Sequence, residues 1–129
     1  MTTAASRHFI DVARDLAPQI RAAADEIERM RRLPLPLVQA MARAGLFRLA
    51  IPRALGGEET DPMTLVRVVE EVAWADGAAG WCVAIGGEYG VFGGYLAPDA
   101  AREQRPACDH WRRISADRES RRRGWRLPR

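Results

Sequence analysis

The sequence predicts an all-α fold for most of its 129 residues. Three observations predict this class. Apolar residues recur at helical spacing, proline and glycine fall where helices would begin or end, and residues 1–101 contain no strand-like alternation. Hydrophobic residues make up 47% of the chain, which supplies a core and excludes extensive disorder. We therefore expect four or five helices packed in a bundle-like layer.

Residues 4–32 are expected to form one long amphipathic helix. Pro18 should kink this helix or split it near Ala17, because proline lacks a backbone N–H and clashes with the preceding turn. The pattern predicts a helix that faces a core, with a coiled-coil seam as the alternative. The apolar stripe consists of Phe9, Ala13, Leu16, Ile20, Ala23, Ile27 and Met30.

A second helix is expected at about residues 36–44, after the sequence LPLP at 33–36 has ended the first one. Pro36 lies near its first turn, and Gly45 is the natural residue to come after its end. Residues 46–60 then form a connection without periodicity.

Asp61-Pro62 is a strong start signal for a third helix, because aspartate caps free N–H groups and proline fits the first helical position. Asp76-Gly77 should end it. The predicted buried face consists of Leu65, Val68, Val69, Val72 and Ala73.

A fourth apolar segment, residues 78–96, is rich in glycine, which disfavours a helix interior. Two interpretations stay open: close approach of another backbone, with or without a broken helix, or contact with a flat ligand. Pro98-Asp99 should begin a fifth short helix that reaches about Glu103.

The net positive charge of the chain comes entirely from its last 28 residues. Residues 1–101 contain 10 Arg and 13 acidic residues, whereas residues 102–129 contain 10 Arg and only 4 acidic residues. The chain has no Lys, and all of its basic residues are Arg. Because arginine codons are GC-rich and lysine codons are AT-rich, this indicates a GC-rich coding sequence. The last 28 residues therefore differ in kind from the acidic globular segment before them.

Motifs for catalysis and metal binding are missing from the sequence. There is no nucleotide-binding glycine loop, zinc spacing or nucleophile elbow, so we name no catalytic and no metal-binding residue. The acidic pairs Asp25-Glu26 and Glu70-Glu71 are interpreted as solvated helix faces. The two cysteines are too few for a disulfide scaffold, and neither a secretory signal nor a membrane span is visible. We therefore expect a cytoplasmic protein.

Two segments, ARAGLFRLAIPRALGGEETDP at 42–62 and VVEEVAWADGAAGW at 68–81, resemble the N-terminal helical domain of the acyl-CoA dehydrogenase superfamily. That superfamily includes flavin-dependent aromatic hydroxylases. The similarity implies a domain at 1–104, which in the family precedes a β domain and a C-terminal helical domain. Those further domains hold most of the flavin site.

The resemblance implies that these helices form one wall of a substrate and flavin cleft, and that the fragment alone is inactive. The parent enzyme would use FAD, or FMN if it is hydroxylase-like, on an acyl thioester or an aromatic substrate. It would be a homo-oligomer, and it would bind neither membrane nor nucleic acid. Trp81 would contact the cofactor, and Tyr89 and Phe92 the substrate. Tyr89 stands where hydroxylase-like relatives tend to carry a histidine, which weakens that alternative.

Residues 105–129 are interpreted as the product of a shifted reading frame. Codons read one nucleotide later permit "DPR, Ala/Val, Ile/Thr, Ile/Thr, Gly" near residues 105–111 and "GGYR" at the end, which resembles the start of the family's β domain. A genuine unstructured tail is the second interpretation. The third is a small nucleic-acid-binding protein that uses residues 36–50 as a helix-turn-helix and the arginines as an anchor.

Overall fold

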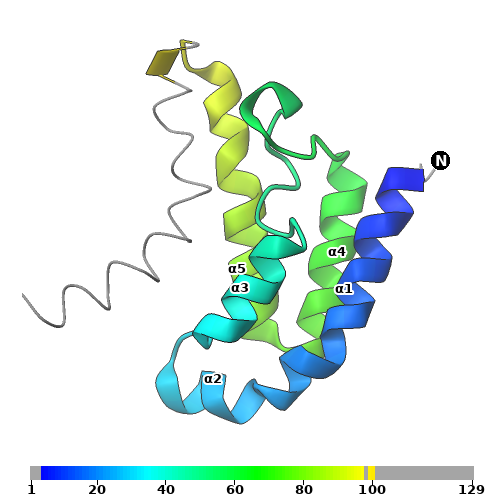
Figure 1. Ribbon diagram of the computed structural model, residues 1–129, viewed down its shortest axis with the longest axis vertical. Helices are drawn as coiled ribbons and strands as arrows, with labels where there is room; N and C mark the ends of the chain where they lie inside the picture. The colour runs from blue at the N-terminus through cyan, green and yellow to red at the C-terminus, as the bar shows by residue number, and fades with distance from the viewer. Residues whose placement is uncertain (1–3, 98, 101–129) are drawn as a thin grey trace, which may run out of the picture.

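The computed structural model describes residues 4–97, 99 and 100 of the chain (Figure 1). Within these residues there are five α-helices and no strand, which confirms the predicted all-α class. The α-helices are α1 (Ala4–Ala22), α2 (Ala24–Met30), α3 (Leu35–Arg43), α4 (Pro62–Ala75) and α5 (Gly77–Glu88). Two 3-10 segments complete the described part, η1 (Arg53–Leu55) and η2 (Tyr89–Tyr95).

Helices α1, α4 and α5 lie side by side, with α4 in the middle (Figure 1). The connection after α3 crosses α5 on the inner side of this layer, where the Phe47 ring lies against Gly86 and the Leu46 carbonyl against Gly87. Side chains of both the helices and the connection after α3 therefore form the core. Its fully buried large members are Ile20, Leu37, Met41, Leu46, Leu49, Val68, Val72 and Val83.

The first predicted helix is real but breaks at a different place. Helix α1 continues through Pro18, and the interruption comes at Ala23, where the N–H bonds to the Ile20 carbonyl at 3.1 Å. The expected split near Ala17 is therefore wrong. Pro18 is exposed, so the Arg14 carbonyl that it leaves without an intrahelical donor can bond to water.

Helix α3 ends as its sequence predicts. Gly45 has φ +81°, its N–H bonds to the Ala42 carbonyl, and the Leu46 N–H reaches back to the Met41 carbonyl. These paired bonds define the Schellman motif, in which a left-handed residue reverses the chain. The chain then runs through a connection of turns and η1, and the next α-helix begins at Pro62. Residues 36–50 therefore do not form a helix-turn-helix.

Two aspartates set the limits of α4 and α5. The Asp61 carboxylate accepts the Thr64 N–H at 3.0 Å, and the Asp76 carboxylate accepts the Ala79 N–H at 2.8 Å. Asp76 also closes α4, because its own N–H bonds to the Val72 carbonyl. The predicted boundaries at Asp61-Pro62 and Asp76-Gly77 are confirmed.

The buried face of α4 is shifted slightly from the predicted one. Val68 and Val72 are buried as expected, but Ala73 is exposed and Thr64 is buried instead. Asp61 explains the buried threonine, because its carboxylate accepts the Thr64 hydroxyl as well as the N–H. A satisfied hydroxyl can be buried at little cost.

Two sequence-based expectations lie outside the described residues. These are the Arg-rich segment 105–129 and most of the fifth helix expected from Pro98 to Glu103. None of the described helices combines the length and the apolar content needed to cross a bilayer.

Candidate functional site

The candidate site is a set of four exposed aromatic side chains along α5 and η2, which we call the aromatic surface: Trp81, Tyr89, Phe92 and Tyr95. All four side chains are largely exposed: 68% for Trp81, 66% for Tyr89, 59% for Phe92 and 86% for Tyr95. Aromatic rings of this size normally bury most of their area in a core or an interface. This aromatic surface therefore offers apolar area that a ligand or another polypeptide would bury.

The structure brings two of the three predicted site residues together. Tyr89 and Phe92 lie at the start of η2 with ring centroids 6.4 Å apart and planes inclined by 68°, an edge-to-face arrangement. Trp81 lies on α5, eight residues before Tyr89, which corresponds to about two turns of a helix. Tyr95, the most exposed of the four, was not singled out by the sequence, because its exposure depends on how η2 leaves the helical layer.

The glycines of α5 and η2 serve close packing within the chain. A Cβ at Gly80 would lie 2.5 Å from the Ala73 Cβ, and a Cβ at Gly90 would lie 2.0 Å from Ile51. A Cβ at Gly86 would lie 2.6 Å from the Phe47 ring, and a Cβ at Gly87 would lie less tightly, 3.2 Å from Cδ1 of Leu65. Of the two interpretations left open by the sequence, close approach by other parts of the chain accounts for these four positions.

Cys82 does not have the surroundings of a reactive thiol. It is a free cysteine, partly buried beside the core. Removal from water raises the pKa of the Cys82 thiol above its ordinary value, and the nearby Asp76 carboxylate raises this pKa further. A nucleophilic cysteine needs the opposite shift, so Cys82 is a packing residue. The described residues also hold no group of three His, Cys, Asp or Glu placed to bind a metal ion.

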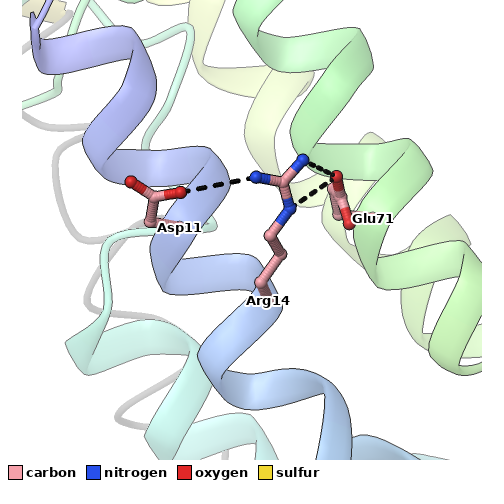
Figure 2. Close-up of polar contacts among 3 residues, drawn as sticks. All are labelled: Asp11, Arg14 and Glu71. Carbon is pink, nitrogen blue, oxygen red and sulfur yellow. Dashed lines mark hydrogen bonds and ion pairs between the residues drawn. The ribbon is translucent and has the colours of Figure 1, made fainter.

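A polar contact between side chains joins α1 to α4 (Figure 2). The Arg14 guanidinium donates from Nε at 2.9 Å and from Nη2 at 2.6 Å to Oε1 of Glu71, and its Nη1 lies 3.5 Å from Asp11. This contact raises the pKa of Arg14, through the hydrogen bond first and the charge of Glu71 second. Glu71 is therefore paired rather than simply solvated, which corrects the interpretation of the Glu70-Glu71 pair. No local sequence signal links residues 57 positions apart.

The connection between α3 and α4 is held by its own polar contacts. Arg48 donates to Glu58 at 3.1 Å and to the Gly56 carbonyl at 3.4 Å, while the Thr60 hydroxyl donates to the Leu49 carbonyl at 2.8 Å. These bonds fold the connection back on itself. Their role is structural, since each joins two parts of the same connection.

The chain matches the family of the acyl-CoA dehydrogenase N-terminal domain over residues 3–108, and it belongs to that family. This is the class of protein that the helical layer and the matched segments define. No solved structure matches the chain significantly.

Its similar proteins include monooxygenases and a reductase. The oxygenase subunit HsaA of a flavin-dependent monooxygenase from Rhodococcus jostii is 38% identical over 82 residues, which are 64% of this chain and 21% of HsaA. Indole-3-acetate monooxygenase from Pseudomonas putida is 32% identical over 66 residues, 51% of this chain and 17% of the enzyme. A 3-(aryl)acrylate reductase from Clostridium sporogenes is 37% identical over 70 residues, 54% of this chain and 19% of the enzyme. The chain thus spans about a fifth of the length of these relatives.

Proposed function

We propose that this chain supplies one wall of the substrate and flavin cleft of a flavin-dependent oxidoreductase, and that it is inactive by itself. The observation that carries the proposal is the exposed aromatic surface, which lies on a family domain that covers only about a fifth of each relative. Trp81 would border the flavin, FAD or FMN, and Tyr89 and Phe92 would border the substrate. Their flat apolar rings suit stacking on rings and exclusion of water.

The parent reaction that the relatives support first is oxygenation of an aromatic substrate, because two of them are named monooxygenases. Oxidation or reduction next to an acyl group is the second candidate, which the aryl-acrylate reductase and a caffeyl-CoA reductase subunit from Acetobacterium woodii support. In both reactions the bound flavin would supply the electron transfer. The residues of this chain would shape the cleft.

Flavin titration of the purified full-length chain tests whether it is inactive by itself. We expect no saturable change in flavin fluorescence with FAD or FMN, and no turnover with reduced flavin and oxygen. Stoichiometric flavin binding or turnover by this chain alone would contradict that part of the proposal.

A chimera tests the contribution to the cleft. In it, the part of the Rhodococcus subunit HsaA that corresponds to residues 4–97 of this chain is replaced by those residues. We expect Trp81→Ala to lower kcat/KM of an active chimera by about tenfold or more, a size typical of a lost aromatic contact. Trp74→Ala is the matched control, since Trp74 is at least as exposed as Trp81 but lies on α4. An unchanged kcat/KM in the Trp81 variant would overturn its assignment.

For residues 105–129 we propose a shifted reading frame, supported by the change in charge and by the family-like alternative translation. Sequencing of the DNA around codons 100–110, with mass spectrometry of the natural protein, tests this. Peptides that contain Trp111 and Trp125 would contradict the proposal, and peptides from the alternative frame would support it.

A further inference from the structure

Four exposed side chains, Met63, Arg67, Glu70 and Trp74, form a line on the outward face of α4, and the exposed Val66 lies beside this line. Their spacing of four, three and four residues places them on a single stripe along the helix, which we call the α4 stripe. Its two apolar members are 62% exposed at Met63 and 77% at Trp74. Trp74 is therefore almost wholly in solvent, although nothing in the α1–α5 packing requires a tryptophan there.

The other sides of α4 are already occupied by the chain itself. Val68 faces the core, and Glu71 faces α1, where it binds Arg14. On the opposite flank, Ala73 packs against Gly80 of α5. The α4 stripe is the remaining side, directed away from the helical layer.

The α4 stripe is complementary to itself when its direction is reversed. It runs apolar, basic, acidic, apolar, and the midpoint of Met63 and Trp74 is also the midpoint of Arg67 and Glu70. That midpoint, between residues 68 and 69, is the middle of α4. A second α4 laid antiparallel across a two-fold axis at this point would place Met63 against Trp74 of the other copy, and Arg67 against Glu70, each contact occurring twice.

We propose that the α4 stripe is a self-association surface, on which a second copy of this chain docks with its α4 antiparallel. Charge complementarity selects a second copy, because the stripe provides its own opposite charges in the required order. Trp74 and Met63 supply the apolar contact, while the exposed ion pairs mainly fix the direction and register. Arg67 also interacts within its own chain, and its five N–H donors can serve both contacts.

The dimer should be weak, because a stripe on one helix is smaller than a standard interface. Sedimentation equilibrium of the full chain should show an average mass that rises with concentration from 14.4 kDa towards twice that value. Trp74→Ala should weaken association by about tenfold or more, as expected for loss of an aromatic anchor. Leu35→Ala is the control, an exposed apolar residue on α3 that lies outside both the α4 stripe and the aromatic surface, and it should leave the dimer unchanged.

Charge reversal tests the antiparallel register. Glu70→Arg and Arg67→Glu should each weaken self-association, because like charges then meet across the axis. An equimolar mixture of these two variants should associate again, since every arginine of one chain then faces a glutamate of the other. Misfolding of either variant cannot produce this recovery, and circular dichroism checks the helix content of each.

Three results would overturn the proposal. The first is a monomer at every concentration reached. The second is association that Leu35→Ala abolishes and Trp74→Ala does not. The third is a charge-reversed mixture that stays as weak as its separate components.

Discussion

At Gly80, helix α5 packs tightly against α4. A Cβ there would lie 2.5 Å from the Ala73 Cβ and 2.8 Å from the Ala73 Cα, so the backbone of α4 would have to move. We expect Gly80→Ala to lower the free energy of unfolding by about 1–3 kcal/mol from overpacking, offset in part by the better helix propensity of alanine.

The matched control for that variant is Gly77→Ala, in the same helix. A Cβ at Gly77 would meet nothing within 4 Å, so this variant should leave the unfolding temperature unchanged or slightly raised. Thermal unfolding followed by circular dichroism compares the two. An equal response of both variants would show that the close contact between α4 and α5 has no energetic weight.

Cys82 gives a prediction for pH. Its pKa is raised above the ordinary value of 9.0, so the unfolded chain loses the thiol proton at a lower pH than the folded chain does. The contribution of Cys82 to stability is therefore complete below about pH 9 and is lost as pH rises through the raised pKa. The pH profile of iodoacetamide alkylation measures this pKa directly.

A Cys108→Ser background leaves Cys82 as the only thiol of the chain. We expect the folded protein to reach half of its maximal alkylation rate at a higher pH than the same variant in urea. If the folded protein reached half of its maximal alkylation rate at the same pH as the unfolded chain or at a lower pH, the raised pKa of Cys82 would be contradicted.

The start of α4 depends on the Asp61 carboxylate, which accepts both the N–H and the hydroxyl of Thr64. Asp61→Ala should lower the free energy of unfolding by about 1–2 kcal/mol, because it removes a helix cap and also leaves the buried Thr64 hydroxyl without its acceptor. Asp76→Ala should cost less, about 1 kcal/mol, since it removes a cap alone. Urea unfolding of both variants, with Asp61→Asn as the conservative control, would contradict this account if their order were reversed.

Helix ends were predictable where a single residue type decides them. Gly45 and the pairs Asp61-Pro62 and Asp76-Gly77 act through local backbone chemistry, and all of them lie where the sequence places them. The break at Ala23 was not predictable, because alanine carries no local signal for an interruption. Pro18 predicted a split in the helix, but α1 continues through it, because Pro18 lies on the exposed side of the helix.

The candidate site was predictable only in its residue types. The resemblance to a flavoenzyme family pointed to Trp81, Tyr89 and Phe92, and the structure places all three at the surface. The packing of Gly80 on Ala73 and the pairing of Arg14 with Glu71 depend instead on the register of helices far apart in sequence. A single sequence contains no periodic signal for such register.

At the scale of the whole molecule, the aromatic surface should make this chain prone to association beyond a dimer. Exposed clustered rings bind apolar dyes and neighbouring molecules. We expect the double variant Tyr89→Gln and Phe92→Gln to bind less of the dye ANS and to be more soluble, with unchanged helix content because both side chains are already exposed. A monomer with a high, cooperative melting temperature and no dye binding would contradict this prediction.

The long separation between α1 and its partner α4 has a consequence for synthesis of the chain. Arg14 meets Glu71, which is 57 residues later, so at about 5–20 residues per second a ribosome needs roughly 3–11 s to deliver the partner. During that interval the apolar stripe of α1 has no α4 to cover it. The nascent N-terminal segment is therefore accessible to chaperones during this interval, and the codons between the two helices set its length.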